Sequence, residues 1–414
     1  MTDQSVAPNA VGSHGLVHSG KTIASRDEAV ALAQALVPQL RTRARQTDSD
    51  RKVPAENIAA LKASGLVRLT APKAFGGSQL GLGALFEAVA EVGSGCGSTG
   101  WVYGVFAGHN WMLSLFPVEA QREIFGDPDA LVASVVRLGG NPARRGAGGF
   151  EFEGAFGKFC SGVDHANWIM AGASVVDQET GSRDQRYFLI PKSEFEVVDD
   201  WFTVGLRGTG SKSLKLARAF VPEHRACSFA DMVKGNAPGS AFHDSPVYRM
   251  PIPQILRFHL SGTPIGIARG ALNAFSEIAG KKLADLSEGE AAEQGALFAR
   301  LSNAAADIDS AVALLLRDAA EIDRTENGAL TPRFDRARYM RDIAYAVNKC
   351  RHAVNSLYEA SGGSAIYDSV DLQRIWRDMN SAAAHNAFMR DKVDTAFGRA
   401  ALGMPPSKFD ALVH

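Results

Sequence analysis

The segment GGFEFEGAF, residues 148–156, marks the point where the chain changes from a helical to a strand-like pattern. Within it, aromatic side chains alternate with charged or small ones, which is the two-residue period of a β-strand. Gly, Asp and Pro separate three further strand-like runs, NWIMAGASVV (167–176), RYFLIP (186–191) and SLKLARAFVP (213–222). These runs predict an antiparallel β-domain, which we place over residues 131–245.

Helical patterns lie on both sides of this β-domain. Ser25 and Glu28 have the spacing of a capping box at the start of a helical domain, residues 23–130, with further helices at 82–92 and 99–116. After the β-domain, residues 246–414 are expected to form a four-helix bundle from long helices at residues 253–279, 288–324, 333–361 and 372–397. Residues 1–22 are small and polar, which is typical of a mobile tail. The fold class is therefore α+β, in the order helical domain, β-domain and bundle.

Composition limits the kinds of partner. A chain of 414 residues is long enough for several packed units. It carries 44 Lys and Arg against 45 Asp and Glu, so bulk charge does not favour nucleic acid or an anionic membrane. Its four cysteines are far apart and form no CxxC pair, which argues against a zinc site or a disulfide framework. No secretory signal is evident, so we expect a cytoplasmic protein acting on a small molecule.

Residues 92–118 carry no formal charge, and a segment of this length could cross a bilayer. Polar residues interrupt it, among them Ser94, Thr99, His109 and Asn110. A buried helix is therefore the better interpretation. The chain also lacks a GxxxxGK[ST] phosphate loop and an HExxH zinc motif, and GLRGTGS (205–211) lacks GxGxxG spacing. If the chain performs redox chemistry, its reducing equivalents must come from another source.

Six segments carry a family resemblance through their joint order and spacing: RKVPAENIAALKASGL (51–66), CGSTGWVYGVFAGH (96–109), CSGVDHANW (160–168), GTGSKSLKL (208–216), EASGGSAIY (359–367) and QRIWRDMNSAAAH (373–385). The chain resembles the acyl-CoA dehydrogenase fold. More narrowly, it resembles the oxygenase components of two-component, reduced-flavin-dependent monooxygenases, which include hydroxyphenylacetate and secosteroid-ring hydroxylases.

The resemblance implies a chemistry and a set of partners. Reduced FMN or FAD would arrive from a separate NAD(P)H-dependent reductase, and O2 would add at flavin C4a to give a hydroperoxide. That species would hydroxylate an aromatic or heteroaromatic substrate, phenolic or indolic. The protein must exclude water from such a site. The family also implies a homotetramer that buries flavin where subunits meet.

The resemblance assigns roles to individual residues. Ser161 and His385 match positions near flavin N5 and C4a, and His109 matches a histidine that faces the substrate phenol. Expected flavin contacts are Trp101, Ser134, Phe159, Cys160, Ser161, Lys282, Gly363, Ser364, His385 and Asn386. Expected substrate contacts are His109, Ser134, Arg257, Phe258 and His259. No metal ligand is expected.

Structural explanations compete with these roles. Ser161 could be a turn residue, His385 an ordinary helix histidine, and Trp101 core filling. A core histidine explains His109 as well as a substrate contact does. The chain also departs from the hydroxyphenylacetate branch, with Pro253 and Lys282 aligned where that branch has arginines and Leu286 near its tyrosine.

Three rival functions remain open from the sequence. An acyl-CoA dehydrogenase or flavin oxidase is one, but Asn386 stands where the commonest dehydrogenases carry a basic Glu, and an amide cannot abstract a proton. A monooxygenase that oxidises sulfur or nitrogen is another. The third is a non-catalytic helical scaffold that has kept the fold.

Overall fold

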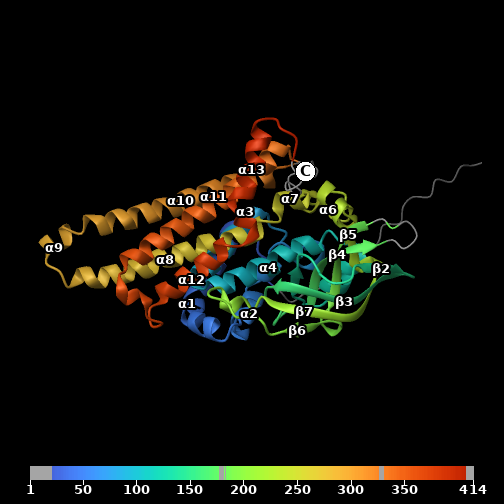
Figure 1. The fold of residues 1–414 in the computed structure, drawn as a ribbon, viewed down its shortest axis with the longest axis horizontal. Helices are drawn as coiled ribbons and strands as arrows, with labels where there is room; N and C mark the ends of the chain where they lie inside the picture. Colours follow the sequence, from blue (N-terminus) through green and yellow to red (C-terminus); the bar gives the residue numbers. More distant parts are fainter. Residues whose placement is uncertain (1–20, 177–180, 182, 326–330, 407–414) are drawn as a thin grey trace, which may run out of the picture.

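A β-sheet lies at one end of the molecule and a bundle of long helices projects from the other, with the N-terminal helices packed between them (Figure 1). The structure is a computed structural model that describes residues 21–176, 181, 183–325 and 331–406, without the side chains of residues 253 and 254. The expected tail of residues 1–22 falls almost entirely outside the described residues, as does the side chain of Pro253.

The N-terminal third is helical, as predicted. Its helices are α1 (Arg26–Ser49), α2 (Ala55–Ala63), α3 (Leu82–Gly95), α4 (Gly97–Leu113) and α5 (Val118–Phe125). Ser25 caps α1, because its Oγ accepts the Glu28 backbone N–H at 3.1 Å. The Glu28 carboxylate in turn accepts the Ala24 N–H at 2.8 Å, one residue earlier than in the standard capping box.

The uncharged segment forms α4, and every residue of this helix is buried. It packs against α3, β1 (Val132–Val135) and α8 (Phe258–Ala284). Gly104 and Gly108 make the approach to α8 possible, because a methyl group at either position would come within 2.4–2.5 Å of His259. Among the described residues, no helix has the length and apolarity needed to cross a bilayer.

The β-domain is one sheet whose strands run in the order β6-β7-β3-β2-β4-β5-β8, with β1 paired to β4. Apart from β1, its strands are β2 (Ala143–Gly146), β3 (Gly149–Cys160), β4 (Trp168–Val176), β5 (Arg183–Pro191), β6 (Glu196–Val198), β7 (Lys212–Pro222) and β8 (Ala226–Ser228). The pairing is mainly antiparallel, as predicted, but β4 pairs in parallel with β1 and β2. A short 3-10 helix, η4 (Arg207–Thr209), precedes β7.

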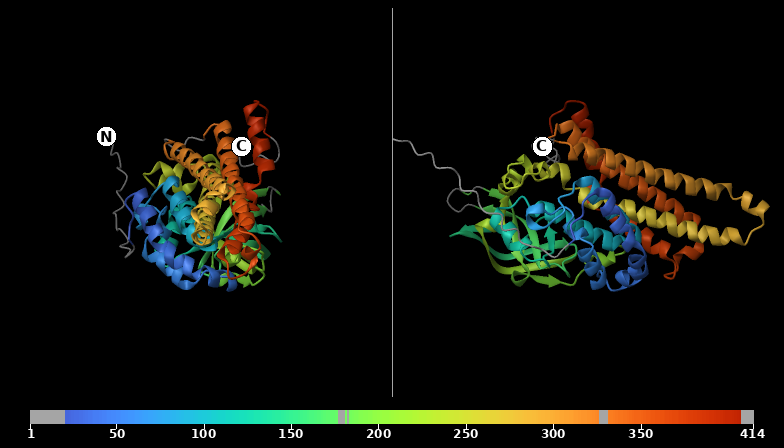
Figure 2. Two further views of the ribbon diagram at one scale, coloured as in Figure 1. Left: turned by 90° about the vertical axis from the view of Figure 1, so that its left-hand side faces the viewer. Right: turned by 180° about the vertical axis from the view of Figure 1, so that it is seen from behind.

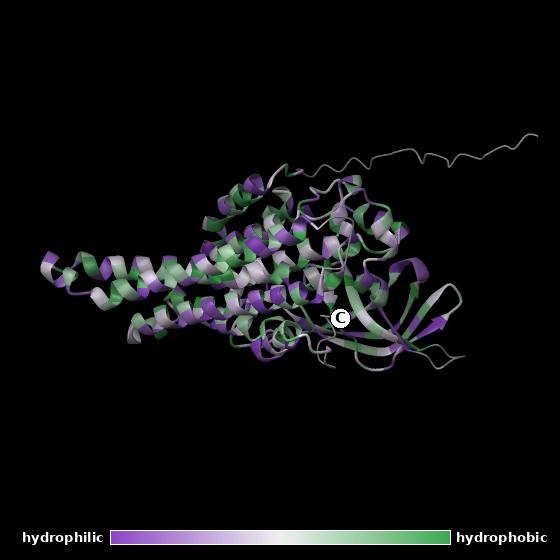
Figure 3. Cartoon of the chain, turned by 90° about the horizontal axis from the view of Figure 1, so that it is seen from above, coloured by the Kyte–Doolittle hydropathy of each residue, from purple (hydrophilic) through white to green (hydrophobic). Residues whose placement is uncertain are grey.

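The C-terminal part forms the bundle from α8, α10 (Gly295–Asp323), α11 (Arg333–Ala360) and α12 (Asp371–Ala383). The short helices are α6 (Phe229–Lys234), α7 (Ile252–Ile255), α9 (Glu288–Ala292) and α13 (Arg390–Ala401). The view from behind shows α8 and α10 reaching beyond the rest of the fold to the tip formed by α9 (Figure 2, right). Hydrophilic and hydrophobic residues are interspersed along these projecting helices (Figure 3).

Three of the four predicted bundle helices are wrong in their extent. The helix predicted over residues 253–279 is divided between α7 and α8, and the helix predicted over residues 288–324 is divided between α9 and α10. The sequence predicts a single helix over residues 372–397, but α12 ends at Ala383 and α13 begins at Arg390. Between them lies the 3-10 turn η10 (Asn386–Phe388), with His385 as its N-cap residue. His385 therefore lies in a break between two helices.

Candidate functional site

A chain of side-chain hydrogen bonds joins α4 to the ends of two strands. The indole Nε1 of Trp101 on α4 donates to Oγ of Ser161, which follows β3, at 3.2 Å. The Ser161 Oγ lies 2.7 Å from Oγ of Ser211, which precedes β7. The Ser211 Oγ lies 2.7 Å from Oγ1 of Thr209 in η4. Within this series of hydrogen bonds, Ser161 is half-buried, and Ser211 and Thr209 are buried.

The segment that carries Thr209 is held by fixed contacts. Leu206 has a left-handed backbone (φ 50°), and its carbonyl accepts the Thr209 hydroxyl at 2.8 Å and the Trp201 indole N–H at 3.1 Å. Its backbone N–H donates to Oδ1 of Asp378 on α12 at 2.6 Å. Because Asp378 is buried, its pKa rises to about 6, although the positive charge of Arg374 opposes the rise. The bundle therefore fixes the position of the hydroxyl chain.

An aromatic cluster lies beside Ser161. The rings of Trp101 and His385 meet edge to face with centroids 5.3 Å apart, and Phe388 packs against both. The Nδ1 atom of His385 accepts the Ala387 backbone N–H at 3.2 Å, so the neutral ring carries its proton on Nε2. His385 is exposed to solvent in this chain. Surrounding protein and the Arg257 guanidinium both lower the pKa of His385.

Arg257 holds the turn that presents His385. It stands immediately before α8, and its Nη1 donates to the backbone carbonyl of Ala387 at 2.9 Å. Burial lowers the pKa of Arg257 to about 10, so the guanidinium remains charged at neutral pH. The contact lies within the His385 break and joins it to the start of the bundle.

Two buried histidines lie near this cluster. The rings of His109 on α4 and His259 on α8 are 5.8 Å apart between centroids. His109 Nδ1 lies 2.7 Å from the carbonyl oxygen of Val132, so Nδ1 carries the proton and Nε2 is left as an acceptor. Burial lowers the pKa of His109 to about 4. Burial, with the nearby positive charges that His109 and His385 can carry, lowers that of His259 to about 3.

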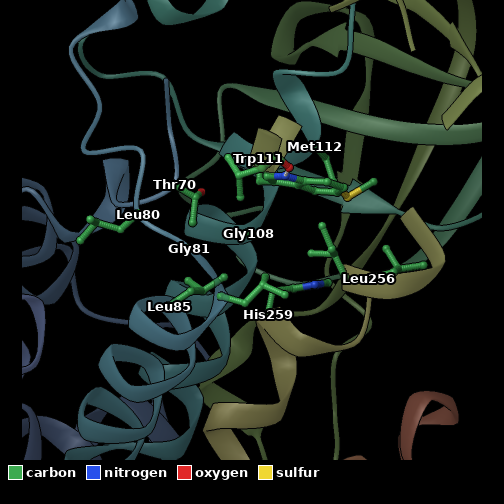
Figure 4. Close-up of a pocket in the computed structure, with 12 residues that line it drawn as sticks. Thr70, Leu80, Gly81, Leu85, Gly108, Trp111, Met112, Leu256 and His259 are labelled. Atoms are coloured by element: carbon green, nitrogen blue, oxygen red, sulfur yellow. Dashed lines mark hydrogen bonds between the residues drawn. The ribbon is translucent and has the colours of Figure 1, made fainter. Parts of the chain in front are cut away.

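A narrow apolar pocket opens beside His259 (Figure 4). Its cavity volume is about 10 Å³, roughly the space of one water molecule. Its wall is mainly aliphatic and aromatic, and comes from the loop before α3, from α3, α4, the turn before α7, α7 and the start of α8. The labelled side chains include Trp111 and Met112 on one side and His259 and Leu256 facing them (Figure 4). The pocket therefore presents apolar side chains and one neutral imidazole, that of His259.

Four further residues that the sequence assigned to the site differ in exposure. Phe159 has a left-handed backbone (φ 63°) and is 70% exposed, with its ring 6.0 Å from that of Trp201. Cys160 is fully buried, and burial raises the pKa of its thiol. Ser134 is half-buried on β1, the strand to which His109 is bonded. Phe258 is buried in the hydrophobic core and does not line the described pocket.

Three assigned residues lie away from this cluster within one chain. Gly363 and Ser364 follow α11 and are exposed, and Lys282 Nζ donates to the Ser361 carbonyl nearby at 3.4 Å. The 13 residues of α12 separate that turn from His385. A helix of this length spans roughly 20 Å. Asn386 is close to His385 but exposed, and it accepts a hydrogen bond from Lys392 at 3.1 Å.

Thr209, Ser211 and Asp378 were not assigned to the site from the sequence. All three lie within segments that carry the family resemblance, GTGSKSLKL and QRIWRDMNSAAAH. The sequence feature that could have indicated Thr209 and Ser211 is a pair of hydroxyl residues in a glycine-rich turn before a strand. Their partner Ser161 lies 50 residues earlier, so local sequence alone does not reveal the contact.

The chain matches known proteins along most of its length. Residues 22–127 match the acyl-CoA dehydrogenase N-terminal domain and residues 259–390 the acyl-CoA dehydrogenase C-terminal domain. The chain is 35% identical to the flavin-dependent monooxygenase oxygenase subunit HsaA of Mycobacterium tuberculosis (strain CDC 1551 / Oshkosh), over 93% of this chain and 98% of the relative. A crystal structure of the M. tuberculosis HsaA monooxygenase matches with a TM-score of 0.84 and 34% identity, covering 93% and 99% of the two chains.

Two further relatives extend the comparison. The FADH(2)-dependent resorcinol hydroxylase oxygenase component of Rhizobium sp. (strain MTP-10005) is 34% identical over 88% of this chain and 92% of the relative. XiaF from Streptomyces sp., solved in complex with FADH2 and glycerol, matches with a TM-score of 0.81 and 26% identity, covering 92% and 96% of the two chains. The chain belongs to the family of flavin-dependent monooxygenase oxygenase subunits, built on the acyl-CoA dehydrogenase fold.

Proposed function

We propose that this chain is the oxygenase component of a two-component monooxygenase that hydroxylates a small aromatic or heteroaromatic substrate, phenolic or indolic. Reduced flavin, as FMN or FAD, would reach it from a separate NAD(P)H-dependent reductase. One observation carries the proposal: Trp101, Ser161 and His385 gather at a single place, beside two buried neutral histidines and an apolar pocket.

The residues present fit a flavin. Ser161 is only half-buried, and its hydroxyl oxygen retains hydrogen-bonding capacity beside the flat Trp101 ring. Phe159, exposed on a left-handed backbone, adds an aromatic surface from β3 that an isoalloxazine ring could cover. Reduced flavin would supply two electrons to O2, so that one oxygen atom reaches the substrate and the other leaves as water.

The chain's own residues would bind the flavin, orient the substrate and exclude water. Ser161 would hold flavin N5 through its hydroxyl. His385 carries a proton on Nε2 in its neutral form and would donate it near C4a. His109, with Nε2 free as an acceptor, would take up or polarise the proton of a substrate hydroxyl. The apolar pocket and the aromatic cluster would exclude bulk water.

The separation of Gly363, Ser364 and Lys282 from His385 supports a further part of the proposal. If these residues contact flavin, they do so from a second copy of the chain, which agrees with a homotetramer whose bundles form the interface. All four cysteines are buried and unpaired, which suits the reducing cytoplasm where we place the protein.

The test combines purified chain with an NAD(P)H:flavin oxidoreductase, FMN or FAD, O2 and a panel of phenols and indoles. We expect hydroxylated product only when the reductase and the chain are both present. An enzyme of the acyl-CoA dehydrogenase type would instead be reduced directly by its substrate without a reductase. The proposal fails if reduced flavin neither binds the chain nor supports product formation with any substrate of the panel.

A further inference from the structure

We propose that the hydroxyls of Thr209 and Ser211 fix Ser161 as a hydrogen-bond acceptor, and that this orientation selects reduced over oxidised flavin. The inference rests on the proposed function, because it requires flavin N5 to face Ser161. Thr209 and Ser211 act here as positioning residues, since they would act through Ser161 and not on the flavin itself.

The direction of the hydrogen bonds follows from the carbonyl that ends the series of hydroxyls. The carbonyl of Leu206 has no hydrogen to give, so the Thr209 hydroxyl must donate to it across their 2.8 Å contact. The Thr209 hydrogen is thereby used, and Ser211 must donate across the next contact of 2.7 Å. The same reasoning makes Ser161 the donor to Ser211, also at 2.7 Å.

The remaining capacity of Ser161 can then be counted. A serine hydroxyl has one hydrogen and two lone pairs. Its hydrogen points to Ser211, and one lone pair accepts the Trp101 indole N–H at 3.2 Å. One lone pair is left, so Ser161 can accept one more hydrogen bond and can donate none.

The two oxidation states of flavin differ in what N5 offers. In reduced flavin N5 carries a hydrogen, which a serine lone pair can accept. In oxidised flavin N5 presents a lone pair of its own, which needs a donor. Ser161 in this orientation would pair with reduced flavin and would oppose oxidised flavin with two facing lone pairs, which leaves both acceptors without a partner.

The anchor of the hydroxyl chain is rigid. The Leu206 carbonyl also accepts the Trp201 indole N–H, and the Leu206 N–H is bonded to buried Asp378. Arg377 on α12 donates to the Val204 carbonyl at 2.7 Å and pairs with Asp48 on α1 at 3.0 Å. Because α1 and α12 hold this segment, the terminal acceptor stays in place when flavin exchanges.

The experiment measures the dissociation constants of reduced flavin, under anaerobic conditions, and of oxidised flavin for each variant. Thr209→Val removes the terminal hydroxyl and keeps the side-chain shape, so Ser211 can turn its hydrogen to Ser161 and Ser161 can donate to N5. Ser211→Ala also releases the Ser161 hydrogen. In both variants we expect the preference for reduced flavin to fall by about tenfold, the worth of one hydrogen bond.

Two matched variants separate this role from a general loss of structure. Thr209→Ser retains the terminal donor and should keep the wild-type preference. Ser213→Ala removes a hydroxyl of β7 that is bonded to Asp200 at 2.6 Å, outside the chain, and should leave both constants unchanged.

The outcomes are distinct. An unchanged preference in Thr209→Val and Ser211→Ala would overturn the inference, as would equal weakening of both flavin states. A wild-type chain that binds the two states equally would also overturn it while leaving the proposed function standing. A wild-type chain that binds no reduced flavin would overturn both.

Discussion

The buried carboxylate of Asp378 gives a prediction about pH and stability. Asp378 is 3% exposed, and burial raises its pKa from 3.8 to about 6. The folded chain then holds this proton more tightly than the unfolded chain by about 3 kcal/mol, at 1.36 kcal/mol per pH unit. As pH rises from about 4 to about 6, the folded chain keeps a proton that the unfolded chain has lost, so the free energy of unfolding falls.

The variant Asp378→Asn removes this titration. Its amide oxygen can still accept the Leu206 N–H, but it carries no charge that burial disfavours. Relative to wild type, the variant should gain about 3 kcal/mol of unfolding free energy between pH 4 and pH 6. For a chain of 414 residues, at about 2.1 cal/mol/K of unfolding entropy per residue, this corresponds to roughly 3–4 °C in Tm.

Thermal unfolding by circular dichroism at pH 4, 5, 6 and 7 measures the change. The control is Asp309→Asn, at an exposed position on α10, whose Tm curve should run parallel to that of wild type. A constant Tm difference between Asp378→Asn and wild type from pH 4 to pH 7 would refute the reasoning.

Three further predictions concern the site. Trp101→Phe keeps an aromatic ring but removes the indole N–H donated to Ser161. The amount of hydrogen peroxide released per reduced flavin consumed should therefore rise roughly two- to tenfold, which corresponds to the free energy of one hydrogen bond. An unchanged peroxide yield would contradict this. Because burial lowers the pKa of His109 to about 4, kcat/KM should show no inflection from this ring between pH 5.5 and 8. The variant His109→Asn should lower kcat/KM about a hundredfold. An inflection near pH 6.5 that disappears in the variant would argue against a neutral His109. Gly162→Ala places a methyl on a left-handed backbone (φ 76°), 2.8 Å from a phenylalanine ring carbon of α4, and should cost about 1–3 kcal/mol of stability; a wild-type Tm would show that the turn can relax.

Local signals predicted local structure well. Ser25 caps α1 because its partner is the backbone three residues on, within reach of any sequence pattern. The break at His385 was missed because the alanines around residues 382–384 favour a helix and no Gly or Pro interrupts them. A distant contact accompanies the break, since Arg257 donates to the Ala387 carbonyl from 130 residues away.

The site shows the same division between local and distant contacts. Trp101, Ser161 and His385 were assigned through family resemblance, and the structure brings these three residues together. Ser211 and Thr209 were not assigned to the site, because the Ser161 hydroxyl that Ser211 contacts lies 50 residues earlier in the chain. Gly363 and Ser364 are exposed and lie away from this cluster within one chain.

The complete burial of α4 has a consequence for biosynthesis. Its main helical partner after α3 is α8, which ends at Ala284, so a nascent chain exposes the uncharged helix until about 170 more residues have been made. At about 5–20 residues per second, that interval lasts roughly 10–30 s. Chaperone supply and growth temperature should therefore govern the yield of this protein, and fragments that end before α8 should aggregate.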